Sequence, residues 1–153
     1  MKNDRIIDSS KLHILSIKTI KGNINAELYD ETVVIDGHQF NINVEDGFDF
    51  NKKIMGITIE VNIQAVNNVL GEVPVTGSYT HEIIFEIDNL QDFIDTTIEN
   101  EITKYVMDAS MAVIPISIAY STIRGIIFNR TQGTPLGSVV LPIIDPKEFL
   151  KNN

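Results

Sequence analysis

The stretch "MGITIEVNIQA", Met55 to Ala65, alternates between apolar and polar or glycine residues over its whole length. Successive side chains of a β-strand point to opposite faces, so the alternation collects the apolar side chains on one face. A sheet with one apolar and one polar face is typical of an antiparallel sheet that is covered on one side only. We therefore predict that this strand belongs to such a sheet.

Three further stretches carry strand patterns. Residues 78–88 repeat the alternation, with Ile84 as the interruption, and residues 40–44 repeat it in short form. Leu12 to Ile20 is a less regular strand. Strands bounded by turn residues in this way predict an antiparallel meander.

Two segments between these strands predict turns. Asp36-Gly37 is a strong signal for a two-residue hairpin turn, because both residue types tolerate the backbone angles that such a turn requires. Residues 67–77 contain two glycines and a proline, which predicts a long loop. The resulting count is four or five strands.

The pattern changes to a helical period after about residue 88. Apolar residues recur at spacings of three and four over residues 88–106, so we predict a first helix there. A second helix is predicted from about Pro115 to Thr131, with Gly133 as its stop. The second helix is apolar nearly all round, so it must be covered on more than one side.

Composition favours one soluble domain over residues 1–153. The chain has 12 Lys and Arg against 21 Asp and Glu, and this net charge of -9, with scattered cations, argues against nucleic-acid binding. It has no cysteine, so disulfides and thiolate chemistry are excluded. The longest apolar run, Met111 to Tyr120, is about half a membrane span, and the N-terminus lacks the apolar core of a signal peptide. We predict a cytoplasmic protein without membrane insertion.

No catalytic or metal site is visible. The three histidines are far apart in sequence, and no glycine pattern resembles a phosphate-binding loop. We expect no metal, no cofactor and no enzyme activity, with Tyr79, His81 and Arg124 as weak candidates for a ligand site beneath the sheet. Arg124 and Arg130 lie in an otherwise apolar helix, where they need acceptors, and a helix-end or subunit contact is the favoured interpretation.

The C-terminal part, "SIAYSTIRGIIFNRTQGTPLGSVVLPIIDPKEF", residues 117–149, resembles the SecB family of protein-export chaperones. That family has a helix with a Tyr and an Arg close together, a basic helix end with a glycine, and a Pro-Leu-apolar-Pro segment before a final aromatic residue. The stretches "GITIEVNIQAV" and "SYTHEIIFEID" resemble its two long central strands, so the resemblance covers about residues 50–150. The matching positions are Tyr120, Arg124, Arg130, Gly133, Pro135, Leu136, Leu141, Pro142 and Phe149.

The resemblance implies an α+β fold, with an antiparallel four-stranded sheet and two helices packed on one face. It also implies assembly into a homotetramer, a dimer of dimers, in which a second copy covers the apolar helix. The implied interface residues are Tyr120, Ile123, Arg124, Ile127 and Arg130.

The function implied is that of a holdase, which binds unfolded polypeptides, including precursors for export, through apolar grooves. The implied groove residues are Leu136, Val139, Leu141, Ile143 and Phe85. In the family, acidic residues on the outer sheet face bind the motor ATPase SecA, and here Glu82, Glu60 and Glu86 are the candidates. The alternative function is a dedicated adaptor, or a chaperone associated with a toxin–antitoxin module, that has one specific protein partner.

Overall fold

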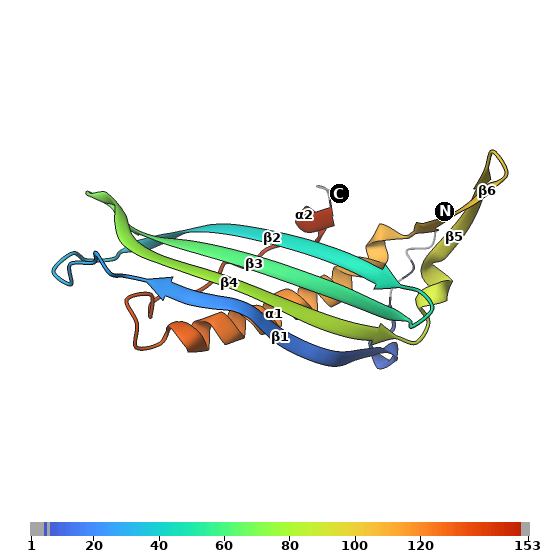
Figure 1. The fold of residues 1–153 in the computed structure, drawn as a ribbon, viewed down its shortest axis with the longest axis horizontal. Helices are drawn as coiled ribbons and strands as arrows, with labels where there is room; N and C mark the ends of the chain where they lie inside the picture. Colours follow the sequence, from blue (N-terminus) through green and yellow to red (C-terminus); the bar gives the residue numbers. More distant parts are fainter. Residues whose placement is uncertain (1–4, 6, 151–153) are drawn as a thin grey trace.

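A long four-stranded antiparallel sheet dominates the computed structural model, which describes Arg5 and residues 7–150 (Figure 1). The strands lie in the order β1-β4-β3-β2, so β3 and β4 are central and β1 and β2 form the two edges. This arrangement confirms the predicted four-stranded antiparallel sheet of an α+β fold. The strand bounds are Leu12–Asn25 for β1, Gly37–Asp49 for β2, Ile54–Asn67 for β3 and Gly71–Ile87 for β4.

The predicted alternation is confirmed along β3 and β4. On β3, the six apolar side chains of the opening stretch are no more than 2% exposed. On β4, Tyr79, Ile83, Phe85 and Ile87 are buried on the same inner face, together with His81. Ile84 does not break the strand, because it lies on the outer face opposite Gly56, where the missing side chain makes room for it.

The long loop predicted for residues 67–77 is wrong, because β4 already begins at Gly71. A short turn connects the strands, in which the side-chain oxygen of Asn67 accepts hydrogen bonds from the backbone N–H groups of Val69 and Leu70, both at 2.9 Å. Pro74 is tolerated inside β4 because it lies where the pairing with β3 shifts register, between the pairs Gln64–Thr76 and Val66–Glu72.

The hairpin predicted at Asp36-Gly37 is also wrong. β1 pairs with β4 and β2 pairs with β3, so residues 26–36 cross between the two edges of the sheet and supply no fifth strand to it. The N–H group of Asp36 donates to the Val66 carbonyl at 3.1 Å, which fixes the start of β2. A turn sequence forms a hairpin only where the segments before and after it pair with each other. Here residues 26–36, which precede the turn, form no strand of the main sheet.

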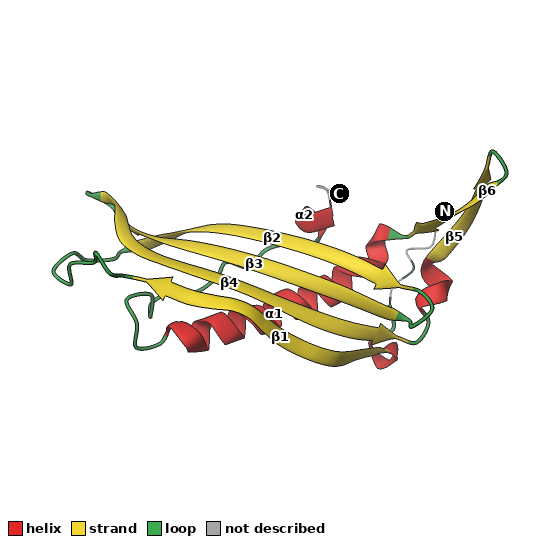
Figure 2. Ribbon diagram, in the orientation of Figure 1, coloured by secondary structure: helices red, strands yellow, loops and turns green. Residues whose placement is uncertain are grey.

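The helix predicted for residues 88–106 is a 3₁₀ turn, η2 (Leu90–Phe93), followed by a β-hairpin of β5 (Ile94–Glu99) and β6 (Ile102–Met107). Asn100 and Glu101, at φ 51° and 63°, form the two-residue turn between the strands. The segment is rich in threonine, isoleucine and valine, whose branched side chains favour strands. Figure 2 shows the hairpin projecting from the end of the main sheet.

One long helix, α1 (Val113–Thr131), packs on the inner face of the sheet, as predicted for about residues 115–131. The 3₁₀ turn η3 (Ala109–Ala112) leads into it, and Asp108 caps that turn by accepting from the Ser110 N–H at 3.0 Å. The second predicted helix is thus the main one. The other regular elements are short: η1 (Ser9–Lys11) and α2 (Lys147–Leu150). The expectation of two helices packed on one face is therefore corrected to one main helix and a four-residue α2.

Candidate peptide-binding site

The segment that follows α1 is held against the helix by two side chains of the helix. The hydroxyl of Tyr120 donates to the Pro142 carbonyl at 2.8 Å, and Nε of Arg124 donates to the Leu141 carbonyl at 3.1 Å. The ring of Phe149 lies 6.0 Å from that of Tyr120. These contacts fix the path of residues 141–149 alongside edge strand β2.

A shallow apolar groove of about 410 Å³ lies between β2 and this segment. Phe40 and Ile42 enter it from the inner face of β2, where they pair with Ile63 and Val61 of β3. The opposite wall consists of Pro142, Ile144, Glu148 and Phe149. Its aromatic and branched side chains are half-buried, so the groove offers adaptable apolar area beside a strand edge, which suits an extended peptide. We call it the β2 groove.

The predicted groove residues lie in two different environments. Phe85, Leu136, Val139 and Leu141 are no more than 3% exposed, because they fill the core between α1, the sheet and the C-terminal segment. Ile143 is the exception at 87% exposed. Sequence reasoning missed Phe40 and Ile42 as groove residues. Their alternation places them on the apolar face, but the alternation does not reveal that β2 is an edge strand.

The predicted interface residues fall into two groups, three buried apolar or aromatic residues and two arginines that donate hydrogen bonds. Tyr120, Ile123 and Ile127 are no more than 5% exposed within the protomer. Arg124 holds the C-terminal segment, and Arg130 reaches edge strand β1, where its guanidinium donates to Oγ1 of Thr19 at 3.4 Å. Both arginines therefore have acceptors within the protomer.

The predicted motor-binding carboxylates lie on the outer face, away from α1 and the β2 groove. Glu82 pairs with Thr58, Glu60 with Thr80, and Glu86 with Ile54, so the three are neighbours across β3 and β4. Glu60 also accepts a hydrogen bond from Nδ2 of Asn62 at 2.8 Å. The structure thus places the three carboxylates on one face of the sheet, where Glu60 is exposed and Glu82 and Glu86 are half-buried.

Two buried polar rings lie under the sheet. Burial raises the pKa of the Tyr120 hydroxyl, and the positive charge of Arg124 partly opposes this. Burial lowers the pKa of His81, and the charge of Arg130 acts in the same direction. Neither ring nitrogen of His81 has a hydrogen-bond partner in the described chain. Within the described residues no three His, Asp or Glu side chains gather as metal ligands.

Residues 109–131, which include α1, are long and apolar enough to cross a membrane by length and composition alone. In this fold they form the helix that covers the inner face of the sheet, and 44% of the apolar window is buried. Helices that cover a sheet in this way pass the same test of length and composition.

The sheet order, the crossover between its edges and the single long helix on one face define a SecB-like fold. Neither the family models nor the curated proteins contain a match to the sequence. Among solved structures, the chain is similar to the SecB-like chaperone Rv1957 of Mycobacterium tuberculosis, solved in complex with a ChAD peptide from the Rv1956 HigA1 antitoxin. The TM-score is 0.57 at 13% identity, over 89% of this chain and 92% of that chain.

Proposed function

We propose that this protein is a chaperone that holds extended or unfolded polypeptide segments in the β2 groove. The observation that carries the proposal is the groove itself, in which half-buried apolar side chains of Phe40, Ile42 and Phe149 lie beside a free sheet edge. Burial of apolar area contributes about 25 cal/mol per Å² without requiring a particular sequence. Such a site therefore suits clients of varied sequence.

The same groove also suits one dedicated partner, such as an antitoxin or another single protein. The solved complex of Rv1957 with an antitoxin peptide supports this second candidate, because it is a SecB-like chaperone with one named peptide bound. The breadth of clients separates the two functions. A general holdase binds several unrelated unfolded proteins with similar affinity, whereas a dedicated chaperone strongly prefers one.

We expect the protein to act as a homo-oligomer. Edge strand β1 has 14 residues and leaves Ile14, Ile17 and Ile20 between 46% and 59% exposed. A long edge with this much apolar surface favours association with another chain, and a second copy is the partner always present. A tetramer, an export role, a cytoplasmic location and binding of a SecA-type motor by Glu82, Glu60 and Glu86 belong to the same proposal.

The test measures binding of a chemically unfolded client protein by fluorescence anisotropy. Ile144→Asp places a charge in the β2 groove, and we expect it to weaken client binding at least about tenfold. Val140→Asp is the matched control, since Val140 lies in the same segment, is 60% exposed and does not line the groove. Equal affinities of the two variants for the client would contradict the groove as the binding site.

A further inference from the structure

A second, larger cleft of about 690 Å³ lies between the β5–β6 hairpin and the end of the main sheet. Its volume is in the range that sites for small molecules usually have. It shares no residue with the β2 groove, so it is a separate feature of the surface. The side chains that shape it are Phe48, Phe50, Asn51, Gln91, Ile94 and Tyr105. We call it the hairpin cleft.

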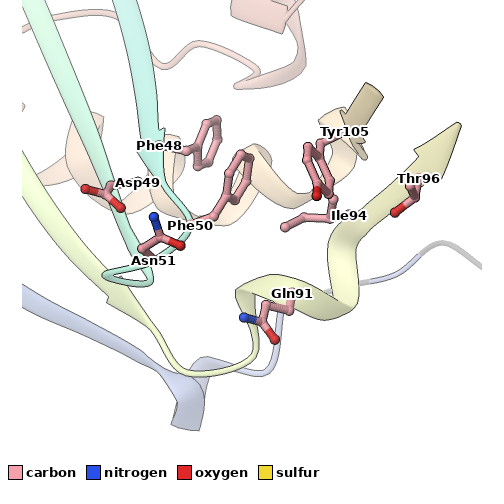
Figure 3. A pocket seen from close by; sticks show the side chains of 8 residues that line it. All are labelled: Phe48, Asp49, Phe50, Asn51, Gln91, Ile94, Thr96 and Tyr105. Atoms are coloured by element: carbon pink, nitrogen blue, oxygen red, sulfur yellow. The ribbon is translucent and has the colours of Figure 1, made fainter. Parts of the chain in front are cut away.

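The hairpin cleft has two walls that consist largely of aromatic rings. On the sheet side, the rings of Phe48 and Phe50 lie parallel, with centroids 6.3 Å apart and planes 2° apart. On the hairpin side, Ile94 and Tyr105 stand opposite these rings (Figure 3). Aromatic side chains favour stacked or edge-on contacts with other rings, so these walls suit a flat ligand.

Two amide side chains lie beside the aromatic walls. Gln91 belongs to η2 and Asn51 to the turn between β2 and β3, and Figure 3 shows both beneath the rings. Both residues are exposed, and neither amide has a hydrogen-bond partner within the described residues. An amide offers donors and an acceptor at one position. The cleft can therefore bond a ligand that carries donors and acceptors along one edge.

The charge of the hairpin cleft disfavours an anionic ligand. The carboxylate of Asp49 lines the cleft, with only the exposed Lys52 near it, at 3.9 Å. None of the described residues that line the cleft is a Lys or an Arg. A phosphate or carboxylate group would find no cation on the walls, and the chain as a whole carries a charge of -9. An uncharged ligand fits these surroundings better.

We propose that the hairpin cleft binds a small uncharged heteroaromatic compound, with the size and chemistry of a nucleobase or nucleoside. Such a ring has apolar faces and an edge with donors and acceptors, which is the division that the cleft itself shows. The ring would lie between Phe50 and Tyr105, and its edge would bond the amide of Gln91. This inference goes beyond the proposed chaperone function, which uses the β2 groove.

A ligand in this position would also join the hairpin to the main sheet. A two-stranded hairpin is marginally stable by itself, and Tyr105 is 66% exposed in the empty protein. A ligand that binds only the closed arrangement stabilises that arrangement. Binding should therefore slow hydrogen exchange of the β5 and β6 amides, and this measurement on the unaltered protein needs no variant.

The test measures binding of adenosine, guanosine, cytidine and uridine by equilibrium dialysis. We expect at least one nucleoside to bind, and Tyr105→Ala to weaken it about tenfold, as for a central aromatic contact. The matched control is Val106→Ala, since Val106 is 50% exposed and lies on the opposite face of the hairpin, where it pairs with Asp95. Its affinity should change by less than about twofold, and circular dichroism checks that both variants fold.

Gln91→Leu tests the polar edge. Adenosine and guanosine share one ring system and differ at the edge, so we expect the wild type to distinguish them at least about threefold. Gln91→Leu should bring the two affinities within about twofold of each other. A wild type that does not distinguish them, or a variant that distinguishes them as well as the wild type does, would contradict the role of Gln91.

Three results would overturn the proposal as a whole. The first is that none of the four nucleosides binds or slows exchange in β5 and β6. The second is equal binding by Tyr105→Ala and Val106→Ala. The third is Tyr105-dependent binding of maltose in place of the nucleosides, which would assign the cleft to a carbohydrate. Ile144→Asp separates this site from the β2 groove, because it should weaken unfolded clients and leave nucleoside binding unchanged.

Discussion

His81 lies on the inner face of β4, is 0% exposed and has no hydrogen-bond partner at either ring nitrogen within the described chain. Its ring centroid is 6.5 Å from that of Tyr79, and Arg130 contributes positive charge nearby. Protonation of His81 would add a second positive charge here, and no hydrogen-bond partner in the described chain would offset the cost of its desolvation. The neutral histidine is therefore the form that the fold accommodates.

This environment predicts that acid destabilises the protein through His81. Because the pKa of His81 is lower in the folded chain than its usual 6.5, the unfolded chain binds the proton more readily. The free energy of unfolding should be at its full value above about pH 6.5 and should fall as the pH drops below it. His81→Leu should flatten this part of the profile in urea titrations from pH 8 to pH 5. Thr76→Leu, at an exposed and non-titrating position of the same strand, serves as the control and should retain the wild-type slope.

Tyr120 and Arg124 show what can be predicted for a single residue. The position of Arg124 in an apolar helix predicts that it needs a polar partner, in a helix-end or subunit contact, whereas Tyr120 is singled out only by the resemblance to the SecB family. The partners are the carbonyls of Pro142 and Leu141, at the far end of an irregular segment. No local pattern reveals the path of such a segment, because its position depends on packing against the whole inner face.

Tyr120→Phe tests the anchoring of this segment. The variant loses the hydrogen bond to the Pro142 carbonyl, and we expect it to lower the free energy of unfolding by about 1 kcal/mol in urea titrations. Thr122→Val is the matched control, because its hydroxyl bonds only the Ile118 carbonyl of its own helix. If proteolysis near residues 140–146 is no faster in Tyr120→Phe than in the control, the anchoring role is wrong.

At the scale of elements, most of the main sheet could be predicted, whereas the first part of β4 and residues 88–106 could not. The alternation over Met55–Ala65 continues without interruption through the whole stretch and is incompatible with a helix. The apolar residues of 88–106 fit a helical spacing, but Thr96, Thr97, Ile98 and their neighbours favour strands. The spacing and the strand preference conflict there, and the segment forms a hairpin with its turn at Asn100 and Glu101.

The β5–β6 hairpin should be the least protected regular element in hydrogen exchange. It forms a separate two-stranded sheet, and its apolar side chains Ile98, Ile102 and Tyr105 are more than 60% exposed. Amides of β5 and β6 should therefore exchange much faster than those of β3 and β4, which lie in the middle of the main sheet. Mass-spectrometric exchange measures both in one sample, and equal protection would show that another chain covers the hairpin.

At the scale of the whole molecule, the sheet has two free edges with different surroundings. Edge strand β2 is accompanied by the C-terminal segment and the β2 groove, whereas edge strand β1 leaves several apolar side chains exposed. The difference supports separate roles, with client binding along β2 and self-association along β1. The sequence indicates that the molecule needs a partner surface, but only the strand order shows which strand provides it.

Self-association along β1 can be tested with a charge at its centre. Ile17→Lys should reduce the solution mass measured by light scattering from a multiple of 17.1 kDa toward that of one chain, because a charge in an apolar contact is costly to bury. Ile143→Lys is the control, since Ile143 is 87% exposed and lies outside β1. A wild-type protein that is already monomeric would contradict this part of the proposal.

The order of the strands also determines when β1 can be completed. β1 is made before the other strands, yet its partner β4 follows β2 and β3 along the chain. Leu12 therefore cannot pair with Ile87 until the chain has been synthesised to that residue. A protein is synthesised from its N-terminus, and pairings distant in sequence form late. Until the ribosome has made β4, the β1 sequence, which contains several isoleucines, has no partner strand. At that stage the nascent chain is itself the kind of client that we propose its finished copies hold.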